Sequence, residues 1–364
     1  MIVDLGGLTA YYPKMLKEEF LYDLPQDRIA LYPSQPRDAC GLLVIHRESG
    51  RIEHRIFHEI VNYLDEGDCL VLNESKVQPV RFRLRRATGG VVELLFTKKV
   101  REGVWVALAR PSKRPKVGER LVGENAEEIV EIEHKKAGKL TLRLLMDESE
   151  LFRRLGLAPL PGYIHRIPEE RDLQTYQTVF AREGFSIAAP TAGLHFTPEL
   201  LKRIRAKGAQ VAYIQLDVGE GTFRPVMTER VEDHRMKAEN YTISPEAAEK
   251  INRARRIIAV GTTVTRTLES LPSPEPIMSH SGSTGLFIYP GHSFKHIHAL
   301  PTNFHQPGST PLLLTSAFCG KELLFKAYEE ALGMDYRFLS YGDAMLILPH
   351  DVAKQRRGDP KKER

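Results

Sequence analysis

Residues 189–199 (APTAGLHFTPE) combine residue types that can hold an anion or a polarised oxygen. The Thr-Pro-Glu run at 197–199 predicts a helix start, because Thr caps, Pro suits the first helical position and Glu suits the positive end of the dipole. Pro190 and Gly193 exclude regular helix or strand just before it, so we expect a shaped loop. Such a loop would bring His195 and backbone N–H groups to a helix N-terminus, where anions bind. A plain helix-entry loop with a packed histidine is the alternative.

Three later segments carry related chemistry. Gly219 and Gly221 allow the backbone to approach a ligand closely, and Arg224 can meet a phosphate or carboxylate. Residues 257–271 predict a strand, a tight turn and a helix, which is the nucleotide-side unit of an α/β sheet. That unit lacks the Gly-x-Gly-x-x-Gly and Walker A patterns, so it does not indicate dinucleotide or ATP binding. The loop at 300–307 is rich in hydrogen-bonding side chains.

The bulk composition is that of a globular protein with room for two domains. The chain has 364 residues, of which 42% are hydrophobic and 27% are charged. No apolar run approaches the roughly 20 residues that span a bilayer, and the N-terminus has no signal-peptide pattern. Three widely separated cysteines fit neither a disulfide framework nor a zinc ribbon, so we expect a cytoplasmic protein with no membrane partner. The formal charge of +5 permits a nucleic-acid partner without requiring one.

The order of elements predicts an α/β main domain with a central, mostly β sheet flanked by helices, plus an inserted small antiparallel β-barrel domain. Residues 78–157 form the expected insertion, because short strand patterns with Gly or Pro turns follow one another there. Residues 1–77 and 158–364 form the discontinuous α/β domain, with flexible ends expected at 1–15 and 350–364. The histidines of the chain lack a nearby carboxylate or cysteine set with ligand spacing, so we expect no metal.

Seven motifs occur in order along the chain. They are PRD at 36–38, APTAGLHFT at 189–197, GEGTFRPV at 219–226, AVGTTVTRTLES at 259–270, TNFH at 302–305, SAFCG at 316–320 and SYGDAMLI at 340–347. Together they resemble the S-adenosylmethionine:tRNA ribosyltransferase-isomerase family of the queuosine pathway, over residues 20–348. The chain departs from the family's pattern at 39–41 (Ala-Cys-Gly), where a Ser-Ser or Ala-Ser pair and an Arg are common, and at Gly285, where Asp is often seen.

The resemblance implies a reaction that the residues alone do not reveal. S-Adenosylmethionine would donate its ribosyl part to the aminomethyl group of 7-aminomethyl-7-deazaguanine at the tRNA wobble position. Adenine and methionine would leave, and the product would be epoxyqueuosine in tRNA. The family needs no metal and no cofactor beyond S-adenosylmethionine, which is consumed. The expected partners are therefore this donor and the anticodon region of tRNA, and we expect a monomer or a weak dimer.

This chemistry asks for a base and a hydrogen-bond donor on opposite sides of a ribose. The base would remove an acidic C5′ hydrogen beside the sulfonium, and the donor would help adenine to leave. His195 is the candidate base, because the ordinary pKa of histidine is near neutrality. Glu239 and Asp343 are candidates for the donor or for orienting groups. For all three, a structural hydrogen bond at a loop end is the alternative.

The motif loops also supply the expected contacts to substrate and tRNA. Aromatic residues in these loops either stack on adenine or an unstacked tRNA base, or belong to the core. Basic residues in or near the motifs are expected phosphate contacts, with surface solvation or internal ion pairs as the alternative. The substrate-binding set is Pro190, Thr191, Gly193, Phe196, Thr197, Gly219, Gly221, Thr222, Phe223, Gly261, Thr262, Asn303 and Phe304, and the tRNA-binding set is Arg37, Lys76, Arg224 and Arg266.

Two other functions compete with this interpretation. An ordinary S-adenosylmethionine methyltransferase would release S-adenosylhomocysteine instead of adenine. A non-catalytic RNA-binding protein would bind tRNA without consuming S-adenosylmethionine, but it would need only basic and aromatic surface. The loops at 190–197 and 219–224 resemble a small-molecule site, which argues against the binding protein.

Overall fold

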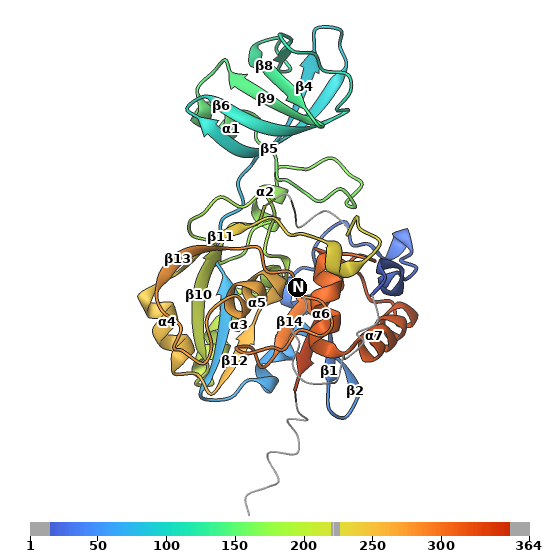
Figure 1. The fold of residues 1–364 in the computed structure, drawn as a ribbon, viewed down its shortest axis with the longest axis vertical. Helices are drawn as coiled ribbons and strands as arrows, with labels where there is room; N and C mark the ends of the chain where they lie inside the picture. The colour runs from blue at the N-terminus through green and yellow to red at the C-terminus, as the bar shows by residue number, and fades with distance from the viewer. Residues whose placement is uncertain (1–14, 220, 222–225, 350–364) are drawn as a thin grey trace, which may run out of the picture.

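The structure, a computed structural model, describes residues 15–219, 221 and 226–349. It consists of an α/β part and a β-barrel that stands at one end of it, at the top of Figure 1. The chain enters the barrel before Arg81 and leaves it near Leu157, and these two residues pair with each other in an isolated antiparallel bridge. The barrel is therefore attached through both of its chain crossings at one place.

The strands of the α/β part divide between two mixed sheets. The first has the order β14 (Leu300–Asn303), β15 (Ala344–Leu348), β1 (Gly41–His46) and β2 (Arg51–Ile56), with β1 parallel to β15. The second has the order β12 (Arg256–Ala259), β3 (Asp68–Asn73), β10 (Gln210–Leu216), β11 (Glu239–Ile243) and β13 (His280–Thr284). In the second sheet β12, β3 and β10 are parallel. An isolated parallel bridge between Ile258 and Ala299 brings the two sheets together.

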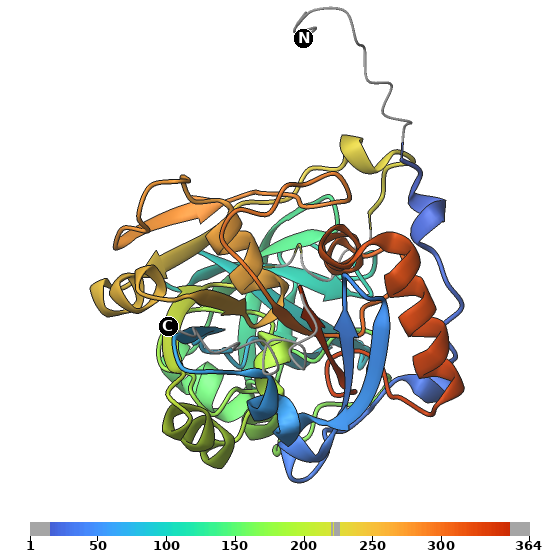
Figure 2. The same cartoon turned by 90° about the horizontal axis from the view of Figure 1, so that it is seen from below.

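Helices cover the sheets and begin where the sequence places caps. The side chains of Thr197, Ser244 and Ser309 accept hydrogen bonds from the backbone at the starts of α3, α4 and α6, and each of these helices has proline in its first turn. Figure 2 shows α7 beside the hairpin of β1 and β2. The α-helices are α1 (Glu148–Leu155), α2 (Asp172–Thr175), α3 (Pro198–Ala206), α4 (Pro245–Asn252), α5 (Gly261–Glu269), α6 (Thr310–Cys319) and α7 (Lys321–Gly333).

Short 3-10 helices shape several of the connections. They are η1 (Lys17–Phe20), η2 (Gln26–Arg28), η3 (Arg37–Ala39), η4 (Phe57–Tyr63), η5 (Thr191–His195) and η7 (Val231–Asp233). Of these, η5 lies inside the loop expected at 189–199, and its buried residues fix that loop against the core.

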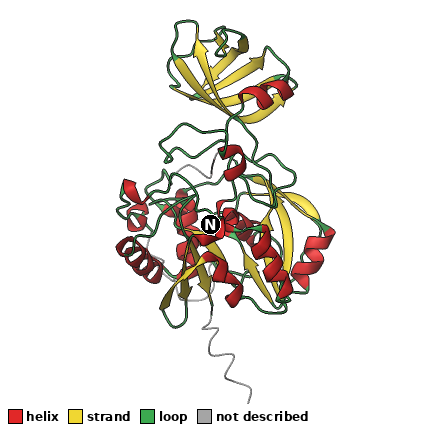
Figure 3. Ribbon diagram, turned by 180° about the vertical axis from the view of Figure 1, so that it is seen from behind, coloured by secondary structure: helices red, strands yellow, loops and turns green. Residues whose placement is uncertain are grey.

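The barrel is closed and antiparallel, with the order β4-β5-β6-β9-β8-β7. Figure 3 shows it as strands with one helix, α1, against it. Its own core contains Phe82, Phe96 and Trp105, with Phe152 of α1 packed on them. The strands are β4 (Arg81–Arg86), β5 (Val91–Arg101), β6 (Val104–Arg110), β7 (Arg120–Val122), β8 (Glu128–Lys136) and β9 (Lys139–Leu144).

The predicted fold class is confirmed, since mixed sheets with flanking helices carry a closed antiparallel barrel. The barrel strands lie within the expected insertion, and the division of the chain at 78–157 stays a prediction. The short strand β7 (Arg120–Val122) was not predicted, because three residues are too few to show alternation. The separation into two sheets was also not predicted, since pairing between distant strands leaves no local pattern. No helix among the described residues is long and apolar enough to cross a membrane.

Candidate functional site

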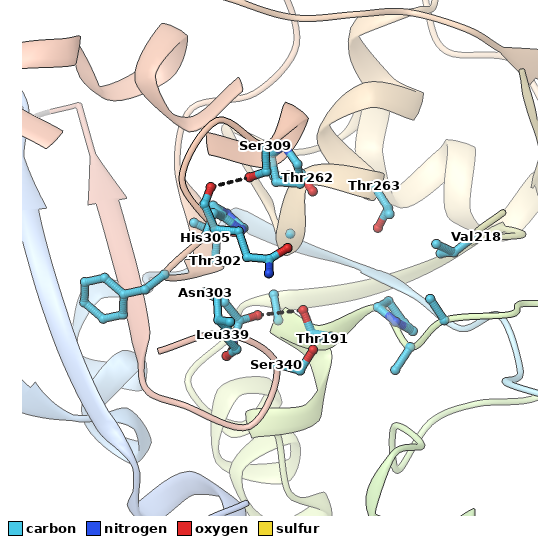
Figure 4. A pocket seen from close by; sticks show the side chains of 18 of the residues that line it. Thr191, Val218, Thr262, Thr263, Thr302, Asn303, His305, Ser309, Leu339 and Ser340 are labelled. Carbon is cyan, nitrogen blue, oxygen red and sulfur yellow. Dashed lines mark hydrogen bonds between the residues drawn. The ribbon is translucent and has the colours of Figure 1, made fainter. Parts of the chain in front are cut away.

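A pocket lies where the two sheets meet, beyond the carboxyl ends of β12 and β14 (Figure 4). Its interior volume is about 90 Å³, and part of the pocket is open to solvent. Three motif loops line it, at Pro190–Thr191, Gly261–Thr262 and Asn303–Phe304. The crevice at the carboxyl ends of strands is where open α/β sheets bind ligands.

One hydrogen-bonded chain runs from the pocket wall into the core. The Thr191 hydroxyl donates to Asn303 Oδ1 at 2.9 Å, as the dashed line in Figure 4 marks. Asn303 Nδ2 lies 2.9 Å from His195 Nε2 and also donates to the carbonyl of Leu339 at 3.2 Å. On its other side His195 Nδ1 lies 3.2 Å from Cys40 Sγ. The chain therefore holds two lining side chains in place through a histidine behind them.

His195 itself is buried and does not line the pocket. Its ring packs on Phe57, with 5.1 Å between the ring centroids. Burial, aided by the charges of Arg337 and Arg37, lowers the pKa of His195 to about 3, so the ring is neutral at pH 7. A ring whose two nitrogens both face protein partners is suited to orienting Asn303. The position of His195 therefore does not support its predicted role as the base that contacts the substrate.

The N-terminus of α5 forms the opposite wall. Gly261 has φ +84° and begins the helix, and a Cβ there would lie 3.2 Å from the Cβ of Ala192. The glycine thus permits both the positive φ and the close approach of α5 to η5. Thr262 and Thr263 follow it in the lining and lie across the pocket from Asn303 (Figure 4).

Glu239 and Arg266 form a buried ion pair. The two side chains are 5% and 7% exposed, and Arg266 Nη1 lies 2.5 Å from Glu239 Oε2. Arg266 also donates to the carbonyls of Leu286 and Thr284, while Glu239 Oε1 accepts from the N–H of Gly219 at 2.8 Å. Protein partners enclose the guanidinium of Arg266, which favours the internal ion pair named as the alternative over the predicted contact with tRNA phosphate. Glu239 does not line the pocket and instead fixes the start of the loop that follows β10.

Asp343 also has a structural setting. Its Oδ1 accepts from the N–H of Gly41 and its Oδ2 from the N–H of Arg337, each at 2.7 Å. It is 6% exposed and lies outside the pocket lining. The carboxylate thereby joins the start of β1 to the turn before β15, so its geometry is that of the alternative named from the sequence, a hydrogen bond at a loop end.

The other predicted substrate residues divide into three groups. Phe196 is fully buried against Phe57, and Gly193 is needed because a Cβ would lie 2.9 Å from the Phe180 ring. Thr197 caps α3 and donates to Asp38. These three support the pocket loop from behind. Gly219 and Gly221 are described but do not line the pocket, whereas Thr222, Phe223 and Arg224 lie outside the described residues.

The two other predicted tRNA contacts have different settings. Arg37 donates to the carbonyls of Gln177 and Gln174, at 2.6 and 2.7 Å, so its guanidinium is partly occupied in holding that segment. Lys76 is exposed at the end of β3. Among the described residues, no cluster of three or more His, Cys, Asp or Glu side chains could hold a metal ion.

Sequence reasoning missed several lining residues. His305 and Gln306 follow Asn303 directly and belong to the loop that was noted for its hydrogen-bonding side chains, so this signal was present. Tyr163 and Ser340 come from segments 177 residues apart and share a hydrogen bond of 2.6 Å. No local pattern joins those two segments, and only the fold brings them to one wall.

Known proteins resemble this chain over nearly its whole length. Residues 17–347 match the profile of a family described as queuosine biosynthesis protein. The chain belongs to this family. It is 47% identical over 339 residues to the S-adenosylmethionine:tRNA ribosyltransferase-isomerase of Thermotoga petrophila, covering 92% of this chain and 100% of the relative. A second relative of the same description, from Moorella thermoacetica, is 48% identical over 91% of this chain and 99% of its own length.

A solved structure agrees with this assignment. The crystal structure of S-adenosylmethionine tRNA ribosyltransferase from Thermotoga maritima is 38% identical and matches with a TM-score of 0.52, covering 91% of this chain and 100% of that chain. The chain is therefore an enzyme of the ribosyltransferase-isomerase family, and the resemblance read from the motifs is confirmed.

Proposed function

We propose that this chain transfers and isomerises the ribosyl moiety of S-adenosylmethionine onto 7-aminomethyl-7-deazaguanine at the wobble position of tRNA. The product is epoxyqueuosine-tRNA, with release of adenine and methionine. The observation that carries the proposal is the convergence of three family motifs, at Pro190–Thr191, Gly261–Thr262 and Asn303–Phe304, on one pocket. S-Adenosylmethionine is consumed in the reaction, and no further cofactor is proposed.

The pocket lining suits a polar, ribose-bearing ligand. Thr191, Thr262 and Ser309 lie on different sides of the pocket (Figure 4), and Gln306 also lines it. Side chains of this kind donate to and accept from ribose hydroxyls and adenine nitrogens. A protein that only binds RNA needs a charged and aromatic surface and no pocket for a small molecule. The pocket therefore favours an enzyme that uses a small molecule over the non-catalytic alternative.

We assign the base role to His305 in place of His195. His305 lines the pocket, and burial lowers its pKa, so its ring is neutral at pH 7. Its Nε2 lies 2.9 Å from the Thr302 hydroxyl. In the tautomer in which Nε2–H donates to Thr302, Nδ1 keeps a lone pair that can take a proton. His195 then becomes a positioning residue that acts through Asn303, and Glu239 and Asp343 hold the loops around the pocket.

The proton on C5′ of S-adenosylmethionine is acidic because the adjacent sulfonium stabilises the carbanion left behind. Removal of this proton by His305 leaves an electron pair on C5′ that forms a C4′=C5′ double bond and breaks the C4′–O4′ bond. The electron pair released on O4′ forms a carbonyl at C1′ and breaks the C1′–N bond to adenine, which takes up a proton. The departing adenine needs a hydrogen-bond donor. The protons of Thr191 and Asn303 are already donated within the hydrogen-bonded chain through His195, so we assign this role to the Thr262 hydroxyl, which also lines the pocket.

The experiment that tests the proposed function is product release. The protein is incubated with S-adenosylmethionine, with and without tRNA carrying 7-aminomethyl-7-deazaguanine, and small molecules are followed by chromatography. Adenine and methionine appearing together, and only with that tRNA, is the expected result. S-Adenosylhomocysteine would indicate methyl transfer, and tRNA binding without turnover would indicate a binding protein. Either of these two results contradicts the proposal.

Replacing His305 with Gln should reduce kcat for adenine release by about 10²–10⁴-fold, the usual contribution of a general base. Gln can keep a hydrogen bond to Thr302 but cannot take the proton. KM for S-adenosylmethionine should change little, and added imidazole should restore part of the rate in His305→Ala. His134→Gln, on an exposed barrel strand, is the matched control. A His305→Gln enzyme with normal kcat would exclude this residue as the base.

A further inference from the structure

Positive charge in this chain is concentrated in the barrel segment. Residues 78–157 contain 18 Lys and Arg against 11 Asp and Glu, an excess of +7, whereas the whole chain carries +5. The remainder of the chain is therefore slightly acidic. The barrel segment thus carries net positive charge and the rest of the chain net negative charge, so the two parts attract different partners.

A group of basic residues lies at one end of the barrel. Arg110 ends β6, Lys113, Arg114 and Lys116 follow in the next loop, and Lys135, Lys136 and Lys139 flank the turn between β8 and β9; we call these seven residues the basic end. The two segments are joined because Lys135 Nζ donates to the carbonyls of Lys113 and Pro115, both at 2.9 Å.

The side chains of the basic end are available to a partner. Arg110, Lys113, Arg114 and Lys136 are exposed, and none forms an ion pair with another described residue. Most acidic residues of the barrel are engaged elsewhere, as in the pairs Arg86–Glu119 and Lys99–Glu148. The charges of Arg110, Lys113, Arg114 and Lys136 thus have no ion-pair partner among the described residues of the barrel.

Three hollows that share lining residues lie one after another from the pocket to the basic end. The pocket shares Tyr163 and Gln306 with a shallow groove, and this groove shares Gly162 with a third hollow between the barrel and the segment 159–162. Arg110 lies in that third hollow, where its guanidinium is 3.5 Å from the position of a Cβ on Gly162. The positive surface therefore begins where the path from the pocket ends.

We propose that the basic end binds the phosphate backbone of the tRNA anticodon stem while the loop nucleotides follow the hollows to the pocket. This proposal rests on the proposed function. A wobble nucleotide must leave the stacked loop to reach an enclosed pocket, and its flanking phosphates must be held outside. The hollows give the single strand a path, and the exposed guanidinium and ammonium groups give its backbone counter-charges. The barrel then serves as the element that positions tRNA.

The test compares two charge-neutralised variants of the full chain. Lys113→Gln/Arg114→Gln removes two charges from the basic end. Lys98→Gln/Arg101→Gln removes two exposed charges from the last four residues of β5, beside the start of β6 and so at its opposite end. Both pairs are exposed on turns or strand ends, so both variants should fold. Binding of full-length tRNA carrying 7-aminomethyl-7-deazaguanine, and of its isolated anticodon stem-loop, is measured across a salt series.

The basic-end variant is expected to bind both RNAs on the order of tenfold more weakly and to lose about two from the slope of log K against log salt. The control variant should match the unaltered chain, and kcat at saturating tRNA should be unchanged in both. Equal slopes for the two variants would overturn the proposal. Because binding is measured without turnover, a chain that releases no adenine would count against the proposed function alone, and the slopes would still decide the role of the basic end.

Discussion

Replacing Arg266 with alanine is expected to lower the free energy of unfolding by about 3–5 kcal/mol, because it removes one partner of a buried ion pair. The carbonyls of Leu286 and Thr284 lose their donors in the same substitution. Denaturant titration of the variant should show a lower midpoint with an unchanged m-value. This would be among the largest effects of a single substitution away from the apolar core.

The chain offers a matched control for Arg266. Arg253 pairs with Glu249 at 2.6 Å, but both side chains are more than half exposed. Arg253→Ala should cost well under 1 kcal/mol, as exposed pairs usually do. A double replacement, Arg266→Met with Glu239→Gln, should recover part of the stability, since no buried charge is left unpaired. If Arg266→Ala and Arg253→Ala lowered the free energy of unfolding by similar amounts, the buried ion pair would stabilise the protein no more than the exposed one does.

The same variant separates the two roles considered for Arg266. A phosphate contact would lower the salt slope of tRNA binding by about one when removed. A buried structural residue should leave the slope unchanged in the fraction of protein that stays folded. We expect the second result, because the guanidinium faces Glu239 and two carbonyls instead of solvent.

Local sequence signals predicted the supports of the site well. The caps at Thr197 and Ser244, the proline after each and the final strand at 344–348 follow from rules that concern only neighbouring residues. The family motifs then identified three loops that line one pocket. Each of these signals depends only on residues within one helical turn or one strand, so it can be recognised directly in the sequence.

Which motif residues face the pocket could not be predicted, because burial depends on partners far away in the chain. Arg266 resembles a surface cation on a helix, and its partner lies 27 residues away on β11. His195 resembles a catalytic residue, and its setting is fixed by Cys40, 155 residues away, and by Asn303, 108 residues away. The sequence therefore identified residues with suitable chemical groups. Only the fold shows which of them line the pocket and which support the pocket loops from behind.

Replacing His195 with Gln is expected to make the protein less sensitive to acid. The pKa of His195 is about 3 in the folded protein, below its ordinary value of 6.5, because burial disfavours the charged ring. Between these two values the unfolded chain binds a proton that the folded chain excludes. Burial of neutral His195 therefore does not reduce the free energy of unfolding above about pH 6.5. Below that value the free energy of unfolding falls as the pH falls toward 3.

The size of the effect follows from the same difference. Each pH unit in this window costs about 1.4 kcal/mol, so at pH 5 the unaltered chain should have lost about 2 kcal/mol more than His195→Gln, relative to pH 7. Gln cannot titrate, yet its amide can still meet Asn303. Urea titrations of both proteins at the two pH values measure this difference, and subtraction cancels other histidines whose pKa is also lowered, such as His305.

A second readout distinguishes positioning from proton transfer at His195. If the ring only orients Asn303, then His195→Gln should lower kcat for adenine release in part, and added imidazole should not restore the rate of His195→Ala. If the ring is the base, His195→Gln should abolish turnover, and added imidazole should restore part of the rate of His195→Ala. The buried ring, with Asn303 at 2.9 Å on one nitrogen and Cys40 at 3.2 Å on the other, requires the first result.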